Sequence, residues 1–559
     1  MCRAARGALL VREFFFVIFT HKCSKFPRHS PTIQFFCEVC APCGGKKGGV
    51  FCFMGKCVVY LLQQRSSRSW NRAEMSELKL KTARTLKWNT FDRVSSQVLY
   101  AVTGIVLANL LSQEDFGLVG AILVFQAFAT LFVDSGFSNA LIQRKSPTDT
   151  DYSTVFYFNL GMSVAIYAVL WVCSPFIDAL FGAGGRLTPM ARVMFLTFII
   201  NATSIVQANR MMKQMSVRMI ALSNAAGLVV SGALGIWLAL EGWGGWAIVW
   251  QSIALATVKS ALLWLTSRWR PLWEFSLKSL RSIFSVGVGV VSSSFLNVLS
   301  LNLCSFIVGA YYSLAQLGCY TQADKWSKMG YISLSQVATV SFLPVLSGAQ
   351  DDTPRFHRLM GKTHRFTAYV TLPCLTLLIV VSEAVFHTLF GVKWDNAILL
   401  FQLLTARGAL VALTSLYNCH ILAVGAPKRL FQSEVVKDSL MVAAIVAAVP
   451  FGIEWLVGGQ VIAAAVYFVY SWWLTAKATG YRVASFAAEL VPYALVSLVS
   501  AIPAVAVGRW GHIGSPVLLL AAQAVAFAVP YLLINAIFRS KIQREVLTYA
   551  FGRVTGKKM

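Results

Sequence analysis

Charged side chains are scarce in this chain. Asp, Glu, Lys and Arg make up 13% of its 559 residues, whereas a soluble globular protein carries roughly 25%. Hydrophobic residues make up 57%, and the mean hydropathy is +0.64. A water-soluble core cannot enclose that much apolar surface. The composition therefore excludes an ordinary soluble protein and predicts a chain that uses lipid as its solvent.

Acidic residues are scarcer than basic ones. The 23 Asp and Glu compare with 49 Lys and Arg, which gives a formal net charge of +26. A basic balance of this size can indicate nucleic acid binding. Here, however, the basic residues lie in short gaps between apolar runs, and no nucleic-acid-binding motif accompanies them. We interpret them as loop charge facing anionic lipid, and we expect no nucleic acid partner.

Long loops and phosphate-binding glycine loops are also missing. No loop between apolar runs exceeds about 20 residues, so we expect no extramembrane catalytic domain. Because no glycine-rich loop could cradle the phosphates of ATP, the sequence also does not favour ATP as the driver. We therefore predict a protein that acts inside the bilayer, needs no cofactor and is not an enzyme.

Residues 1–74 differ from the rest of the chain. They hold 12 Lys and Arg against three acidic residues, and seven of the 12 cysteines fall in this part. The run Cys37-x-x-Cys40-x-x-Cys43 supplies only half of a typical zinc-binding motif, so we expect no metal site. We interpret this part as a basic, cysteine-rich extension that is disordered or lies upstream of the true translation start at Met75.

From Met75 onward, fourteen apolar stretches are long enough to cross a bilayer as helices, which takes about 20 residues each. They lie at 90–111, 117–137, 154–174, 188–209, 218–240, 244–266, 282–303, 316–345, 366–388, 396–422, 430–452, 455–476, 488–508 and 514–537. This pattern predicts an all-α fold, a polytopic transmembrane helical bundle of about 14 spans.

The loops alternate in charge. The loops after even-numbered stretches, together with the C-terminal tail, carry 23 Lys and Arg, whereas the opposite loops carry only Arg186, Lys393 and Arg509. Basic loops stay in the cytoplasm, so both termini are predicted to be cytoplasmic. An error of one span would destroy this alternation, so the count supports the assignment of spans.

Two segments resemble each other within the chain. Residues 107–121 read LANLLSQEDFGLVGA, and residues 307–323 read IVGAYYSLAQLGCYTQA. Each places a glycine, Gly117 or Gly318, after a short external turn between two spans, and each belongs to a block of six spans. Two similar halves are typical of transporters in which one half rocks against the other. The predicted domains are the extension at 1–74, an N-terminal six-helix lobe at 75–270, a C-terminal six-helix lobe at 271–480, two added helices at 481–540 and a basic tail at 541–559.

Three segments, Asp134–Leu160, Glu241–Pro271 and Gly425–Leu440, resemble the polysaccharide-export flippases of the WzxC type, and the resemblance covers essentially all of 75–540. This family is related to the multidrug exporters called MATE and to the lipid II flippase. The resemblance implies two pseudo-symmetric, MATE-like six-helix lobes around a central cavity in the bacterial inner membrane. It also implies transport of an undecaprenyl-diphosphate oligosaccharide to the periplasmic leaflet, with a polysaccharide polymerase and a chain-length regulator as further partners.

Three cations within the spans are candidates for binding an anionic substrate. A charge near the middle of a spanning helix costs about 3 kcal/mol or more, so it should face a wet cavity or a partner. Arg407 lies mid-span, and its fork suits a diphosphate; the alternative is a structural pair with a carboxylate of another span. Lys259 could equally extend its stem to the interface. Lys325 could line the cavity, or it could belong to a hydrated, irregular start of its span.

Five further charged residues are candidates for gating or ion coupling: Asp92, Arg93, Asp134, Asp324 and Glu383. Each has a structural alternative. Asp92 and Arg93 open the first span, where most charges are interfacial anchors. Asp134 could cap a helix or form a local ion pair, and Asp324 shares the alternative given for Lys325. Glu383 is a weak candidate for proton binding.

Neutral polar residues in the spans could bind sugar. Asn297, Asn302 and Gln251 have this capacity, although polar contacts between helices explain them equally well. Two rival functions remain. A MATE-type exporter would have the same architecture, but it favours cations and should have an acidic lumen. A glycan polymerase or ligase would need a sizeable external loop with catalytic groups.

Overall fold

The computed structural model describes residues 84–545 and 548, except 86, 136–140, 142, 143, 145, 146, 512 and 513; the side chains of 134, 135, 283–294, 296, 297, 337, 338 and 340 are also left out. The chain divides at residue 84, and everything below concerns the unit Arg84–Met559. The predicted extension at 1–74, with its cysteine run, and most of the tail at 541–559 lie outside the described residues, as do the side chains of Asp134 and Asn297.

The described part of the chain is built from helices and their connections, without strands. Residues 87–110 form the first helix. The elements that follow are α4 (Gln113–Thr130), the π-helical turn η1 (Leu131–Ser135), α6 (Asp149–Leu180), α7 (Leu187–Met194), α8 (Leu196–Lys213), α9 (Val217–Leu240), α10 (Trp246–Thr266), α11 (Leu277–Tyr311), α12 (Leu314–Ser347), α13 (Thr353–Val380), α14 (Ser382–Leu389), the short 3-10 turn η2 (Val392–Trp394), α15 (Asp395–Ala423), α16 (Pro427–Ala448), the 3-10 turn η3 (Val449–Phe451), α17 (Ile453–Thr479), α18 (Val483–Trp510) and α19 (Pro516–Ile537). The all-α prediction is confirmed.

The predicted spans coincide with these helices. Each of the fourteen stretches overlaps one helix or two consecutive helices. Helices α7 and α8 share one stretch, and α13 and α14 share another. Among the described residues, eleven helices are long and apolar enough to cross a membrane. The protein is therefore a multi-pass membrane protein, while the count of fourteen remains a prediction.

Local sequence explains where the helices begin. Ser112, Thr148 and Ser313 are the N-cap residues of α4, α6 and α12, and each side chain accepts a hydrogen bond from the backbone N–H three residues later, in a capping box. The surface of the bundle is apolar: Phe176 is 72% exposed and Leu265 is 79% exposed. Side chains of this kind are exposed along helices because they face lipid rather than water.

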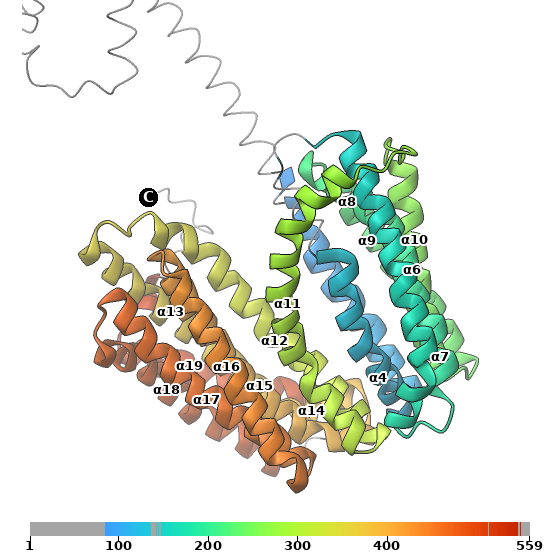
Figure 1. Cartoon of the computed structure of the whole chain (residues 1–559). Coiled ribbons are helices and arrows are strands. Elements are labelled where there is room, and N and C mark those ends of the chain that lie inside the picture. The colour runs from blue at the N-terminus through green and yellow to red at the C-terminus, as the bar shows by residue number, and fades with distance from the viewer. Residues whose placement is uncertain are drawn as a thin grey trace, which may run out of the picture. The chain divides into compact units, whose positions relative to one another are not determined.

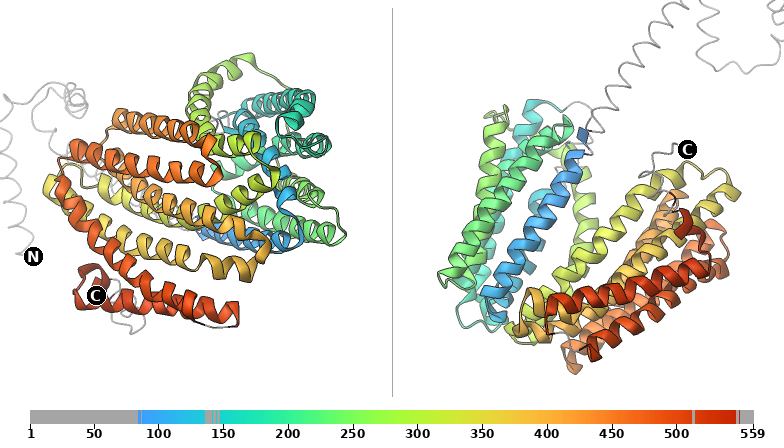
Figure 2. Two further views of the ribbon diagram at one scale, coloured as in Figure 1. Left: turned by 90° about the horizontal axis from the view of Figure 1, so that it is seen from below. Right: turned by 180° about the vertical axis from the view of Figure 1, so that it is seen from behind.

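The helices form two groups. In Figure 1, α4 and α6–α10 lie on one side, α13–α19 lie on the other, and α11 and α12 run between them. The two groups meet at the end that holds α7 and α14 and diverge toward the opposite end, as the view from behind in Figure 2 also shows. The largest apolar core lies at the meeting end. It joins Phe116 and Met190 of the first group to Phe386, Trp394 and Leu456 of the second.

Candidate substrate cavity

A cavity of about 580 Å³ opens among the helices of the first group. Its walls come from residues 100–107, α4, the end of α7, α8, α9 and α10, and α12 contributes one residue from the second half of the chain, Lys325. A cavity of this size falls in the range of small-molecule sites. It is thus large enough to take the polar part of a substrate.

The charge of this cavity comes from two lysines. Among the described residues that line it, Lys259 and Lys325 alone carry a charge, and neither forms an ion pair with a carboxylate in the described part of the chain. Gly104 makes room for Lys325, because a Cβ at that position would lie 2.7 Å from the Lys325 Nζ. The cavity is therefore electropositive, with one cation from each half of the protein.

Neutral amides and hydroxyls supply the rest of its polar surface. Gln251 was predicted from the sequence, whereas Gln126, Asn201 and Asn224 were missed. The sequence contains a signal for some of these residues, namely polar residues at helical spacing. Gln126 and Thr130 are four residues apart on one face of α4, and Thr197 and Asn201 are four residues apart on one face of α8. Gln126 donates to the Thr197 hydroxyl at 3.2 Å, and its own carbonyl oxygen has no partner among the described residues. Such groups can hydrogen-bond a glycan.

Arg407 is not among the residues that line this cavity. It is buried in the second half, where its Nη2 lies 3.6 Å from the Asp324 Oδ1 and its Nη1 donates to Gln460 Oε1. Lys328 also pairs with Asp324, at 2.5 Å. The geometry thus agrees with the alternative that the sequence left open, a structural pair with a carboxylate of another span.

We predict that Arg407→Ala lowers stability without changing the affinity for substrate. Removing one partner of a buried ion pair typically costs about 3–5 kcal/mol when the other charge is left unpaired. Here Asp324 keeps its pair with Lys328, so we expect a smaller loss, to which the Gln460 carbonyl oxygen adds when it loses its Arg407 donor. The melting temperature of the purified protein should therefore fall, and Arg358→Ala, which removes an exposed arginine, should leave it unchanged. A variant with the normal melting temperature but no substrate binding would instead return Arg407 to the binding site.

Asp324 and Lys325 are neighbours in sequence, but their side chains point toward different halves of the protein. Helix α12 is continuous from Leu314 to Ser347, so the irregular start expected for this span is not found. Successive residues on a helix point about 100° apart. Asp324 consequently faces Arg407 in α15, whereas Lys325 reaches the cavity and passes 5.4 Å from the Trp326 ring centre.

The acidic candidates lie in different places. Asp92 accepts a hydrogen bond at 3.0 Å from Asn224, which lines the cavity, and Arg93 is exposed. Glu383 is exposed in the first turn of α14. Asp134 belongs to η1, and its side chain lies outside the described residues. Of the candidates in this paragraph whose side chains the structure describes, Asp92 alone lies next to the cavity. A role in gating or coupling remains a prediction for all of them.

The two repeated segments cross at one end of the cavity with a local two-fold pattern. A Cβ on Gly117 would lie 1.9 Å from the carbonyl oxygen of Leu314, and a Cβ on Gly318 would lie 1.9 Å from that of Gln113. Gln113 is the first residue of α4 and Leu314 is the first residue of α12. Each glycine therefore lets the start of the other helix pack directly on its backbone, and the predicted repeat reappears as a reciprocal contact.

A second set of contacts joins the two halves at the same end of the bundle. The Lys393 Nζ donates to the carbonyl oxygens of Asn109 and Leu111, at 2.7 and 2.8 Å, and the Trp394 indole donates to that of Ala108 at 3.0 Å. These carbonyls end the first helix, where a cation and donors are favourable. In the sequence, Lys393 was noted only as one of three basic residues in the loops predicted to be external, and nothing there indicated this contact.

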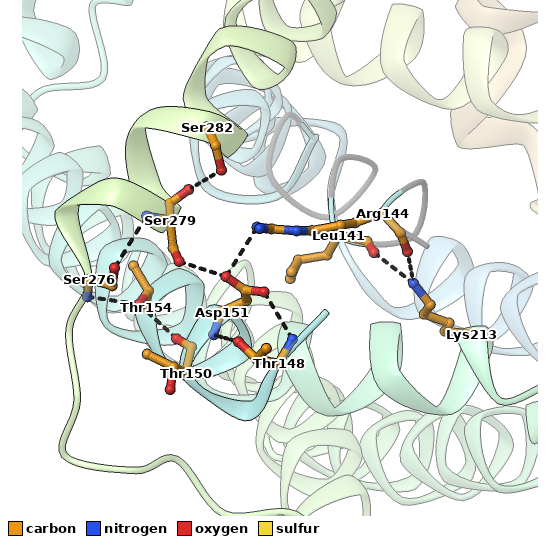
Figure 3. Close-up of polar contacts among 10 residues, drawn as sticks. All are labelled: Leu141, Arg144, Thr148, Thr150, Asp151, Thr154, Lys213, Ser276, Ser279 and Ser282. Atoms are coloured by element: carbon orange, nitrogen blue, oxygen red, sulfur yellow. Dashed lines mark hydrogen bonds and ion pairs between the residues drawn. The ribbon is translucent and has the colours of Figure 1, made fainter. Parts of the chain in front are cut away.

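The start of α11 is anchored on the start of α6, as Figure 3 shows. Asp151, in the first turn of α6, accepts hydrogen bonds from the Ser279 hydroxyl at 2.6 Å, the Thr148 N–H at 2.9 Å and Arg144 Nη1 at 3.1 Å. Ser279 belongs to the first turn of α11. The Asp134–Leu160 segment, one of the three on which the family resemblance rests, thus fastens the helix that begins the second half.

A family model described as "Polysaccharide biosynthesis protein" matches residues 106–399, which is more than half of the chain. The chain belongs to this family. The matched range contains the cavity helices from α4 to α10, both repeated glycines and the linker between the halves.

Curated relatives agree with this assignment. The chain is 24% identical to the succinoglycan biosynthesis transport protein ExoT of Rhizobium meliloti over 484 residues, which cover 84% of this chain and 96% of that protein. It is 25% identical to the lipopolysaccharide biosynthesis protein WzxC of Escherichia coli over 377 residues, which cover 66% of this chain and 75% of WzxC. The resemblance inferred from the sequence is confirmed.

Solved structures share the fold. The lipid II flippase MurJ, in an inward closed conformation, superimposes with a TM-score of 0.65 at 15% identity, covering 82% of this chain and 99% of MurJ. A MATE family multidrug transporter in an inward-facing conformation gives a TM-score of 0.53 at 17% identity, covering 69% of this chain and 96% of the transporter. The MATE-like architecture is confirmed, but it does not identify the cargo.

Proposed function

We propose that this protein is a flippase for lipid-linked oligosaccharides in polysaccharide biosynthesis. One observation carries the proposal: Lys259 and Lys325, from opposite halves, line a cavity that is otherwise rich in neutral hydrogen-bonding groups. A diphosphate carries negative charge and pairs with ammonium groups, while amides and hydroxyls hydrogen-bond a glycan. The names of the relatives, which concern succinoglycan transport and lipopolysaccharide biosynthesis, support the same class of cargo.

The mechanism is physical and breaks no bond. The polar headgroup enters the cavity while the polyprenyl chain stays in lipid, since a headgroup of this size cannot cross the hydrocarbon alone. The glycine crossing of α4 and α12 and the Lys393 contact then separate, and the opposite end closes. Because Lys325 comes from the second half and Lys259 from the first, rocking changes the distance between the two cations and loosens their joint hold on the diphosphate.

The orientation follows from the loop charges. We place both termini in the cytoplasm and the α4–α12 crossing on the periplasmic side of the bacterial inner membrane. The cavity then receives substrate from the cytoplasmic leaflet. A polymerase and a chain-length regulator would act on the unit after it has crossed, as the family resemblance implies.

The acidic lumen expected of a cation exporter does not match this cavity. No Asp or Glu is among its described lining residues, so a cationic drug would meet two lysines without a compensating carboxylate. This observation favours the anionic cargo over a MATE-type exporter, although the two share a fold.

The proposal is tested with the purified full-length protein in liposomes. A fluorescent undecaprenyl-diphosphate oligosaccharide is placed in the bilayer, and a membrane-impermeant reductant bleaches only the fluorophores of the outer leaflet. We expect the protein to raise the bleached fraction from about half toward completeness. Unchanged bleaching, together with export of cationic drugs by the same preparation, would overturn the proposal.

A further inference from the structure

A second pocket lies at the end of the bundle opposite the glycine crossing. It has a volume of about 530 Å³ and is formed by the end of α8, the turn into α9, the end of α10 and the linker toward α11. Its charged lining residues are Asp149, Arg210, Arg268 and Arg270, and Trp269 forms part of its wall. It shares no lining residue with the substrate cavity.

The arginines leave this pocket with an uncompensated positive charge. Arg210 pairs with Asp149 at 2.6 Å. Arg268 is exposed and forms no ion pair in the described part of the chain, and Arg270 donates to two backbone carbonyl oxygens of the linker at 2.7 and 3.0 Å. Carbonyls orient a guanidinium without neutralising it. The three arginines and one carboxylate therefore leave two net positive charges in one pocket.

Aromatic rings hold two of the guanidinium groups in place. Arg210 lies over the rings of Tyr152 and Trp269, at 5.4 and 6.0 Å from their centres, and Arg270 lies 5.2 Å from the centre of the Trp264 ring. A fixed guanidinium loses little conformational entropy when it binds, and its planar fork matches the oxygens of a phosphate. The pocket is thus prepared for a phosphate group.

The surroundings of the pocket are apolar and exposed. Leu265 is 79% exposed, Trp273 is 95% exposed, and Met212 and Leu272 are 49% and 44% exposed. All four lie within a few residues of the lining arginines along the chain. Exposed Leu, Met and Trp beside arginines are typical of the membrane–water interface, where Trp is enriched. A ligand in this pocket can therefore have its phosphate among the arginines and its acyl chains against these side chains.

We propose that this arginine pocket binds the headgroup of an anionic phospholipid, such as phosphatidylglycerol, at the cytoplasmic surface. Basic pockets between transmembrane helices on this side can hold anionic headgroups. Arg268 and Arg270 belong to the linker whose Leu272 and Ser276 N–H groups donate to Ser153 and Thr154 of α6, so a bound lipid would hold this linker against the first half. The proposal does not depend on the identity of the transported cargo.

The test measures lipid retained by the purified full-length protein with native mass spectrometry. Phosphatidylglycerol and phosphatidylcholine with identical acyl chains are supplied in separate experiments. We expect clear retention of phosphatidylglycerol over phosphatidylcholine, and a loss of about 20- to 30-fold in the double variant Arg268→Ala/Arg270→Ala, from the typical contribution of two basic residues at an anionic surface. The single variant Arg268→Glu, which changes only an exposed side chain, should also lower retention.

The matched control is Arg355→Ala/Arg358→Ala, which removes two exposed arginines from α13 in the other half and should keep normal retention. Equal retention by the two double variants would overturn the proposal. Undecaprenyl diphosphate bound in preference to phosphatidylglycerol, and lost in the Arg268/Arg270 variant, would overturn it in favour of a substrate site. Displacement of phosphatidylglycerol by inorganic phosphate at equal concentration would overturn it in favour of a simple anion site.

Discussion

Replacing the two cavity lysines should abolish transport. We expect Lys325→Ala and Lys259→Ala each to lower the flipping rate at low substrate concentration by about 10- to 100-fold, because hydrogen bonds to charged groups typically contribute about 1.5–3 kcal/mol. The double variant should be inactive. Lys325→Arg should keep part of the activity, since it retains the charge but not the fit beside Gly104. The measurement is the initial rate of fluorophore bleaching in liposomes.

Lys278→Ala is the matched control for these variants. Lys278 is an exposed lysine in the first turn of α11 and does not line the cavity, so its loss should leave the rate unchanged. The melting temperatures of all variants should stay close to normal, because neither cavity lysine has an ion-pair partner in the described part of the chain. A well-folded Lys259→Ala/Lys325→Ala protein that still flips substrate at the normal rate would refute the cationic site.

Adding one methyl group at either repeated glycine should open the external end of the protein. In Gly117→Ala or Gly318→Ala, the new Cβ would lie 1.9 Å from a backbone carbonyl oxygen, whereas carbon contacts normally lie beyond about 3 Å. Backbone cannot rotate away as a side chain does, so α4 and α12 must separate by roughly 1 Å or more. We expect transport to fall at least about tenfold, and by similar amounts in the two variants because their contacts are reciprocal.

Thiol labelling measures this opening directly. In a cysteine-free background, a reporter cysteine replaces Thr103, which is 8% exposed and lines the cavity. A membrane-impermeant maleimide added from outside should label it faster in both alanine variants. Gly161→Ala is the control, because a Cβ there would meet nothing within 4 Å. External labelling that stays at the level of the control would show that the crossing does not seal this end.

Much of the fold could be predicted because lipid imposes strong rules on sequence. Backbone groups in hydrocarbon must be paired within a helix, so every long apolar run forms a helix. The main differences from the predicted spans are the sites where a helix is broken, as at Val381 between α13 and α14. The repeat was visible because a glycine follows a short external turn in both halves. Gly117 and Gly318 were identified in this way, although their reciprocal packing was not.

The cavity was predicted less completely, and Arg407 shows why. Its mid-span position made it the first candidate, yet it faces Asp324, while the less central Lys259 reaches the cavity. Hydropathy places a residue at a depth in the membrane, but it does not give the rotation of the helix about its axis. The missed amides Asn201 and Asn224 lie on α8 and α9, and the rotation of these helices decides which of their residues face the cavity.

By itself, the sequence determined that this chain is embedded in lipid, that its spans form two related halves and that some of its spans carry cations. The length of the apolar runs, the alternation of charge between loops and the repeated segments can all be read directly from the order of the residues. Only the tertiary structure decided which cations share the cavity, which one is neutralised by a carboxylate and where the halves touch. These features depend on how helices that are distant in sequence are rotated and packed against one another. Side-chain volumes and close backbone contacts, such as those at the two glycines, determine that packing.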